Sequence, residues 1–356
     1  MKVGIVTFQE TNNYGALLQN YALQKAIKDA GHSCDTIDYK SSYIGRPLGF
    51  AHLKNKGLKT YLLGVAGYLI YLPRSKRNRF FRKNISYSPK MYKEDLEELN
   101  DTYDMFICGS DQVWNYKLTG DDPYYFMDFV KDKNKCVSFA ASLGLNEIDD
   151  KHKGMFIHYL SEYKYLSARE ESASKLVGEC VKRDIETVPD PCMLLDASEW
   201  EAVSLRPLKR GYVYVYQLGV SKDVVLLAKK IAKEKKLEII YTPFPVGSMS
   251  GGEYRINAGA QDVLGFIRDA EYVITDSFHG TLLSIIMNKQ FFTKCSGTHA
   301  GVGNRIHDLL TRYGLTNRLL SGELDYTEDI DYSSLNDKLN EDRENAKNIL
   351  YKIMNN

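Results

Sequence analysis

A histidine between two apolar segments, His279, has the surroundings of a ligand-binding loop. Residues 272–275 are typical of a buried strand, and the apolar run from Gly280 onward is typical of a helix. His279 would lie where a parallel strand ends and a helix begins, which is where open α/β sheets bind ligands. Backbone N–H groups at the start of that helix, near Gly280 and Thr281, suit a phosphate or carboxylate. The alternative is a loop histidine that hydrogen-bonds the backbone.

A second group of polar residues follows the apolar run 104–108. A carboxylate, two amides and an indole at one strand end could bind sugar hydroxyls and the face of a sugar ring. The alternative is a capped turn with a buried tryptophan. The group consists of Gly109, Ser110, Asp111, Gln112, Trp114 and Asn115.

The chain opens with a βαβ pattern: an apolar strand over residues 3–8, a polar turn, and a helix over residues 16–30. Asn13, Tyr14 and Gly15 lie in the turn, and the glycine would allow close approach of a ligand. No G-x-G-x-x-G fingerprint is present, so the pattern does not indicate dinucleotide binding. A plain strand–helix turn explains these residues equally well.

Three further strand ends carry small or charged residues. Small residues at 140–144, including Ser142, end one strand. Arg169 either binds an anion at the sheet edge or pairs with a carboxylate in the fold. Asp190 lies between two prolines and therefore has a restricted backbone. Arg305 begins a helix, where it could bind an anion or form a structural ion pair.

The segment 74–83 is strongly basic and contains two phenylalanines. It could receive an anionic acceptor or an anionic membrane surface. We favour the simpler interpretation, a solvated helix face. The preceding apolar stretch, 61–72, is shorter than the ~20 residues that a membrane-spanning helix needs.

The overall composition indicates an ordinary soluble protein. With 44% hydrophobic residues and 47 basic against 46 acidic residues, it gives no whole-chain argument for nucleic acid binding. None of the six cysteines forms a C-x-x-C pair, so they are interpreted as buried thiols in a reducing compartment. The amino terminus enters a strand directly, and we expect no signal peptide.

These elements alternate between strand and helix in both halves of the 356-residue chain. The predicted fold is α/β, with two Rossmann-like domains facing each other across a cleft. A polar stretch around 196–210 suggests the boundary. We expect an acceptor-side domain over residues 1–205, a donor-side domain over 206–335 and a carboxy-terminal helix over 336–356.

Taken in order, the motifs resemble the polysaccharide pyruvyl transferase family. The resemblance implies a glycosyltransferase-B-like fold and transfer of the enolpyruvyl group of phosphoenolpyruvate to a sugar. The product would be a pyruvate ketal on a bacterial-type polysaccharide or its precursor, with release of phosphate. The motifs that carry it are residues 13–16, 109–115, 140–144, 167–170, 190–191 and 275–280.

One position departs from some members of this family, which have Arg-Leu before the histidine. Here Ser277 and Phe278 precede His279. The charge that binds the donor must then come from elsewhere, or the donor differs.

The resemblance also implies roles for individual residues. His279 would transfer a proton or hold the phosphate, since imidazole can do either near neutral pH. Asp111, or less plausibly Asp276, would accept the proton of the sugar hydroxyl. The expected donor-side contacts are Arg169, Ser277, Gly280, Thr281 and Arg305, and the expected acceptor-side contacts are Asn13, Tyr14, Gln112, Trp114 and Asn115.

We expect no metal ion and no cofactor, because we find no H-x-H, D-x-D or clustered carboxylate set that demands a metal. The expected partners are phosphoenolpyruvate and a sugar, nucleotide-sugar or lipid-linked saccharide, without nucleic acid. A cytoplasmic location is expected, and peripheral contact with the inner membrane face through residues 61–83 stays open. A sugar-nucleotide-dependent glycosyltransferase and a non-catalytic sugar-binding relative are the alternatives.

Overall fold

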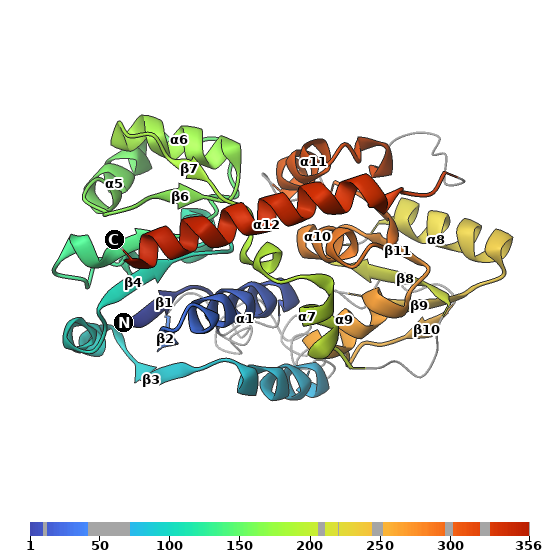
Figure 1. The fold of residues 1–356 in the computed structure, drawn as a ribbon, viewed down its shortest axis with the longest axis horizontal. Coiled ribbons are helices and arrows are strands. Elements are labelled where there is room, and N and C mark those ends of the chain that lie inside the picture. The colour runs from blue at the N-terminus through green and yellow to red at the C-terminus, as the bar shows by residue number, and fades with distance from the viewer. Residues whose placement is uncertain are drawn as a thin grey trace, which may run out of the picture. The chain divides into compact units, whose positions relative to one another are not determined.

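The computed structural model divides the chain into two compact units. Unit 1 comprises the described residues within Met1–Arg46, Arg82–Leu195 and Asn340–Asn356, and unit 2 those within Pro47–Phe81 and Asp196–Leu339. Each unit is built around a parallel sheet (Figure 1). The structure describes residues 1–9, 13–41, 72–205, 211–219, 221–243, 252–295, 302–320 and 328–355.

These units differ from the predicted domain boundaries in two respects. The chain passes into unit 2 after Leu195, not after residue 205, and the helical residues 72–81 belong to unit 2. Hydrogen bonds explain the second difference, because Arg74 Nε donates to the Ile256 carbonyl and Arg77 pairs with Asp262. A prediction that divides the chain into contiguous domains cannot anticipate that an early segment belongs to the later unit.

Unit 1 contains a five-stranded parallel sheet with the order β3-β2-β1-β4-β5. A two-stranded parallel sheet, β6 and β7, accompanies it. The strands are β1 Lys2–Val6, β2 Ser33–Tyr39, β3 Tyr87–Met91, β4 Met105–Cys108, β5 Cys136–Ser138, β6 Ser167–Ala168 and β7 Glu186–Thr187.

The helices of unit 1 follow the expected pattern. Four of them are α-helices: α1 Tyr14–Asp29, α4 Tyr116–Thr119, α5 Asp150–Leu160 and α6 Glu171–Val181. Five short 3₁₀ helices complete the described elements: η1 Arg82–Asn84, η2 Lys93–Asp101, η3 Pro123–Phe126, η4 Lys133–Lys135 and η5 Pro191–Leu194.

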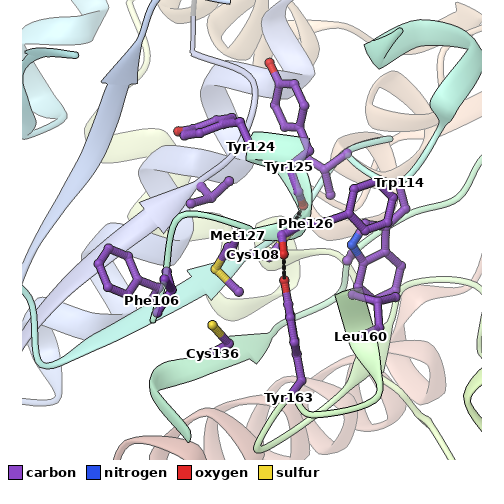
Figure 2. Packing of buried hydrophobic residues seen from close by; sticks show 14 of the residues in the cluster. Phe106, Cys108, Trp114, Tyr124, Tyr125, Phe126, Met127, Cys136, Leu160 and Tyr163 are labelled. Atoms are coloured by element: carbon purple, nitrogen blue, oxygen red, sulfur yellow. Dashed lines mark hydrogen bonds between the residues drawn. The ribbon is translucent and has the colours of Figure 1, made fainter. Parts of the chain in front are cut away.

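Apolar side chains cover both faces of the unit 1 sheet, because a parallel sheet is buried on both sides. Phe106 and Cys108 point into one cluster, and Ile107 between them joins the other. Figure 2 shows the first cluster, where the buried Tyr163 hydroxyl donates to the Phe126 carbonyl at 2.7 Å. All six cysteines are free in the structure.

Unit 2 repeats the same strand order with its own strands, β10-β9-β8-β11-β12, all parallel. The strands are β8 Tyr212–Gln217, β9 Glu238–Pro243, β10 Glu253–Tyr254, β11 Tyr272–Thr275 and β12 Gln290–Thr293. The helices are α7 Ala197–Ala202, α8 Lys222–Lys235, α9 Ala260–Asp269, α10 Phe278–Ile286, α11 Val302–Arg312, η7 Thr316–Arg318 and α12 Tyr332–Asn355.

The long helix α12 contributes to both units. In unit 2 the Tyr332 hydroxyl donates to the Lys289 carbonyl at 2.6 Å. In unit 1 Leu350 and Ile353 join the core, and Arg343 Nε donates to the Met193 carbonyl. The predicted carboxy-terminal helix therefore exists and starts at Tyr332, four residues earlier than expected.

The α/β class and the two Rossmann-like units are confirmed, and they are the components of a glycosyltransferase-B-like chain. Their arrangement across a cleft stays a prediction. No described helix is long and apolar enough to cross a membrane. Most of the proposed membrane contact, residues 61–71, lies outside the described residues.

Candidate functional site

His279 lies where the sequence predicted, in the first turn of α10 directly after β11. Ser277 is the N-cap of that helix, and its hydroxyl accepts the Gly280 N–H at 3.2 Å. The Thr281 N–H donates to the Ser277 carbonyl at 2.9 Å, and the Thr281 hydroxyl donates to Thr293 Oγ1 at 2.8 Å. The backbone N–H groups of Gly280 and Thr281, which were expected to bind the donor, therefore have hydrogen-bond acceptors on Ser277.

Asp276 has a structural role that the sequence did not reveal. Its two carboxylate oxygens accept the N–H groups of Leu218 and Gly219, at 2.6 and 2.9 Å. The carboxylate therefore ties the loop after β8 to the end of β11. This arrangement leaves Asp276 a poor candidate for the base, which the sequence already ranked below Asp111.

Gly280 is required for close packing at the carboxyl end of the sheet. A Cβ atom at this position would lie 2.6 Å from Thr275 Oγ1 and 2.9 Å from the Tyr216 ring. Real Cβ atoms do not approach other atoms so closely, so the start of α10 packs against β8 and β11 through a missing side chain. The glycine fixes the position of the His279 loop.

Two neighbours define the surroundings of His279 in unit 2. The Phe278 ring meets the imidazole edge to face, with centroids 5.2 Å apart. The Arg305 guanidinium lies over the Phe278 ring, 5.7 Å from its centroid. The structure thus brings Arg305 of α11 to the start of α10, as its predicted donor-side role requires.

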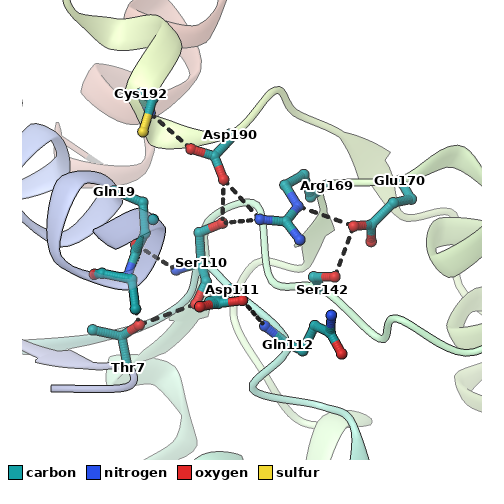
Figure 3. Close-up of polar contacts among 12 residues, drawn as sticks. Thr7, Gln19, Ser110, Asp111, Gln112, Ser142, Arg169, Glu170, Asp190 and Cys192 are labelled. Carbon is teal, nitrogen blue, oxygen red and sulfur yellow. Dashed lines mark hydrogen bonds and ion pairs between the residues drawn. The ribbon is translucent and has the colours of Figure 1, made fainter. Parts of the chain in front are cut away.

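In unit 1 a network of charged side chains is centred on Arg169 (Figure 3). Arg169 Nη1 donates to Asp190 Oδ2 at 2.7 Å, and Nε donates to Glu170 Oε1 at 2.9 Å. All three side chains are buried. Burial alone would lower the Arg169 pKa, but the charges of Glu170, Asp190 and Asp111 outweigh it and raise that pKa. The structure therefore favours the structural ion pair over an anion-binding role for Arg169.

Asp111 keeps one carboxylate oxygen available for chemistry. Oδ1 accepts the Gln112 N–H at 2.9 Å, and no described residue hydrogen-bonds Oδ2. The backbone at Asp111 is left-handed, with φ of 65°. Its carbonyl accepts the Ser142 N–H, and the Ser142 hydroxyl donates to Glu170 at 2.7 Å. The Arg169 network thus holds the Asp111 loop through Ser142.

The other side of this loop is fixed by the first βα unit. Ser110 N–H donates to Gln19 Oε1, and Gln19 Nε2 donates to Thr7 Oγ1 at 2.9 Å (Figure 3). The Ser110 hydroxyl donates to Asp190 at 3.2 Å. Asp111 therefore extends from a backbone that is held on both sides.

The residues that were predicted to contact the acceptor differ in their exposure to solvent. Trp114 is 0% exposed and packs in the unit 1 core, so its predicted contact with a sugar face is wrong and the buried-tryptophan alternative holds (Figure 2). Asn115 caps α4 and donates to Gln112 Oε1 at 2.9 Å, which orients that side chain. Asn13 is exposed and caps α1, whereas Tyr14 is buried.

A comparison with protein-family models identifies the family of the chain. The model named polysaccharide pyruvyl transferase matches residues 13–293, which include both the Asp111 loop and the His279 loop. The chain belongs to the polysaccharide pyruvyl transferase family. The resemblance inferred from the ordered motifs is confirmed.

Solved structures give matches at low identity. A UDP-GlcNAc 2-epimerase from Neisseria meningitidis is 8% identical, covers 99% of both chains and has a TM-score of 0.47. The Methanocaldococcus jannaschii UDP-GlcNAc 2-epimerase is 12% identical over 97% of this chain and 92% of that chain, with a TM-score of 0.49. Escherichia coli heptosyltransferase WaaC with ADP is 12% identical over 96% and 100%, with a TM-score of 0.39. No curated protein matches the chain.

Sequence reasoning missed two groups of residues that shape this family member. Glu170, Gln19 and Thr7 complete the unit 1 network, and only Glu170 had a signal, as the neighbour of Arg169. In unit 2 it missed Tyr216 and Arg74. Both are buried, and Arg74 was assigned to a solvated basic helix face.

Proposed function

We propose that the protein transfers the enolpyruvyl group of phosphoenolpyruvate to two hydroxyls of one sugar, forming a pyruvate ketal and releasing phosphate. The observation that carries the proposal is the family match, which spans the Asp111 loop and the His279 loop. The acceptor is a sugar of a bacterial-type polysaccharide or its nucleotide- or lipid-linked precursor. No cofactor or metal ion takes part.

The reaction balances with two hydroxyl protons. C3 of the enol gains one proton and becomes a methyl group, and C2 forms two new C–O bonds to the sugar. The C2–O bond to phosphate breaks, and the leaving phosphate takes up the second proton. A general acid for C3 and a base for the hydroxyl are therefore needed.

Unit 2 supplies the donor side in this proposal. His279 protonates C3 or neutralises the leaving phosphate, because imidazole can exchange a proton near neutral pH. Arg305, held over Phe278, supplies positive charge that the Ser277–Phe278 pair lacks. The role first expected for Arg169 falls to Arg305, because Arg169 is paired with Glu170 and Asp190.

Unit 1 supplies the acceptor side. Asp111 accepts the hydroxyl proton through Oδ2, while Oδ1 stays bound to the Gln112 amide. Gln112, oriented by Asn115, and Asn13 at the start of α1 are the amides proposed to contact sugar hydroxyls. Preorganised groups of this kind need little reorganisation during the reaction.

The test is incubation with phosphoenolpyruvate and a panel of free, nucleotide-linked and lipid-linked sugars. We expect one phosphate released for each acceptor that gains the mass of pyruvate less one water. Activity should survive a chelator. Release of a nucleoside diphosphate without consumption of phosphoenolpyruvate would instead identify a glycosyltransferase.

A further inference from the structure

The helical segment 72–81 is anchored to the carboxyl edge of the unit 2 sheet. Three of its side chains make the contacts: Arg74 Nε to the Ile256 carbonyl at 3.1 Å, Asn78 Oδ1 from the Ala260 N–H at 3.1 Å, and Arg77 to Asp262. Because β10 is parallel to β9, the chain that leaves β10 for α9 starts at the carboxyl edge. The segment therefore packs at the edge where α10 and His279 begin.

A glycine makes this contact close. A Cβ atom at Gly259 would lie 2.7 Å from Arg77 Cβ and 3.2 Å from the Arg77 carbonyl carbon. The segment approaches the start of α9 through this missing side chain. Its placement is thus specified by packing as well as by hydrogen bonds.

The prediction of a solvated helix face holds for only one side of this segment. Lys76, Arg79 and Phe80 are exposed, as expected for such a face. Arg74 and Asn78 are each 1% exposed and lie one turn apart on the opposite face. The prediction of a solvated face is therefore wrong for Arg74, the first cation of the run.

The charge of Arg74 acts at the carboxyl end of β8. Burial raises the pKa of the Tyr216 phenol, and a side-chain hydrogen bond with Ser277 and the nearby Arg74 charge oppose that rise. Ser277 is the N-cap of α10, which contains His279. Arg74, Tyr216 and Ser277 thus form one polar cluster beside the candidate donor site.

Several buried polar atoms of unit 2 have no hydrogen-bond partner among the described residues. Among them are Asn78 Nδ2, whose residue lies one helical turn from Arg74, and Thr242 Oγ1, whose residue pairs with Tyr216 in the sheet. Buried polar groups are nearly always hydrogen-bonded, so such atoms call for an explanation. A ligand oxyanion would accept from the Asn78 amide.

We propose that Arg74 and Asn78 bind a phosphate-type oxyanion at the carboxyl edge of the unit 2 sheet. A guanidinium matches phosphate geometry, and a buried amide donor adds specificity. The inference rests on the proposed function for the identity of the ligand, which is the phosphate of phosphoenolpyruvate or of a nucleotide- or lipid-linked acceptor. The anion site itself does not depend on that reaction.

Binding of inorganic phosphate, measured by titration calorimetry, tests the site directly. We expect Arg74→Gln to weaken binding by about tenfold to a hundredfold, the loss typical of a hydrogen bond to a charged group. Arg77→Gln is the matched control, because Arg77 lies on the same helix and its side chain is 54% exposed in the pair with Asp262. It should bind phosphate within about twofold of wild type, as surface ion pairs contribute little.

A second variant keeps the test informative if Arg74→Gln does not fold. Asn78→Asp keeps a side-chain oxygen of the same size that can accept the Ala260 N–H. It replaces the orphaned donor with a negative charge, so phosphate binding should fall at least tenfold, while the circular dichroism spectrum stays native. Wild-type affinity in Asn78→Asp, or in a folded Arg74→Gln, would overturn the site, as would absence of phosphate binding to the wild type.

Kinetics distinguishes the two sources of phosphate. A rise in KM for phosphoenolpyruvate in Arg74→Gln assigns the site to the donor, and a rise in KM for the acceptor assigns it to the acceptor. If phosphoenolpyruvate is not consumed but phosphate binding depends on Arg74, the proposed function fails and the anion site stands. If phosphate binding is unchanged in Arg74→Gln and phosphoenolpyruvate is still consumed, the anion site fails and the function stands.

Discussion

Units 1 and 2 have the same strand order, yet the buried arginines of the two units have different neighbours. In unit 1 the buried Arg169 is bound by Glu170 and Asp190, so the positive charge is satisfied within the fold. In unit 2 Arg74 and Arg305 lie beside the aromatic side chains of Tyr216 and Phe278. We propose that this difference in neighbours gives the unit 1 arginine a structural role and the unit 2 arginines a ligand-binding role.

The aspartates of the two units illustrate the same difference. Asp276 binds backbone N–H groups with both of its oxygens and ties one loop to another. Asp111 binds one N–H with one oxygen, and no described residue hydrogen-bonds the other. The comparison therefore favours Asp111 over Asp276 as the proposed base, and Asp276 has a positioning role.

The largest expected effect is loss of the proposed proton transfer in unit 2. His279→Ala should lower kcat for ketal formation by about 10² to 10⁴, the usual contribution of a positioned general acid or base. The matched control is His307→Ala, which removes an exposed histidine of the same unit. Equal ketal yield from a folded His279→Ala protein would exclude histidine catalysis.

The second prediction concerns the charge balance of unit 1. Arg169→Met leaves Glu170 and Asp190 buried without their cation, which should lower the free energy of unfolding by about 3–5 kcal/mol. Urea denaturation measures this loss. A change below about 1 kcal/mol, the range of surface ion pairs, would show that the network is not structural.

The third prediction compares one glycine from each unit. A Cβ at Gly109 would lie 2.1 Å from the Phe139 carbonyl oxygen, at a φ of 141° that side chains rarely adopt, whereas the nearest atom to a Cβ at Gly280 is a threonine hydroxyl. We expect Gly280→Ala to cost roughly 1–3 kcal/mol of overpacking and Gly109→Ala roughly 1–3 kcal/mol more from backbone strain. Denaturation midpoints of the two variants give the order, and the reverse order would contradict it.

The smallest expected effect is a gradual loss of stability as pH rises above 9. In unit 1 burial raises the pKa of the Cys34 and Cys136 thiols from 9.0 to about 12. The unfolded chain therefore loses these protons from pH 9 upward while the folded chain retains them, and stability falls as pH rises from 9 to 12. In unit 2 burial also raises the pKa of the Cys295 thiol, and it raises the pKa of the Tyr241 phenol from 10.0 to about 12.

Hydrogen exchange cannot follow this loss at high pH, because amides exchange too fast, so denaturant midpoints at stepped pH values are the appropriate measurement. Replacement of Cys34 and Cys136 by alanine should make the dependence between pH 9 and 10 less steep, and the buried Cys108 and Cys192, whose pKa values are also raised, keep the rest of it. Stability that is constant or rises over this range would contradict the assignment.

Much of the fold could be predicted because buried parallel strands are continuous apolar runs. The strands β1, β4, β8 and β11 were found in this way. Two edge strands, β3 and β10, were missed for physical reasons: β10 has only two residues, and β3 contains Pro89 and two exposed positions. Short edge strands carry little of the apolar pattern on which the prediction relies.

The candidate site was predictable where it depends on local sequence. His279 and Asp111 follow apolar strands, so their places at strand ends could be read directly. The pairing of Arg169 with Asp190 spans 21 residues and could not be chosen over anion binding. Arg74 was missed because a cation at helical spacing is normally solvated, and its burial depends on contacts with residues about 180 positions away.

The central claim is that this chain forms a pyruvate ketal from phosphoenolpyruvate, and the most direct test uses the reaction in heavy water. Mass spectrometry of the product from an accepted sugar should show one deuterium in the new methyl group, because C3 gains its proton during transfer. Phosphate should appear in equal amount. A product without carbon-bound deuterium, or one that gains a sugar in place of pyruvate, would contradict the account.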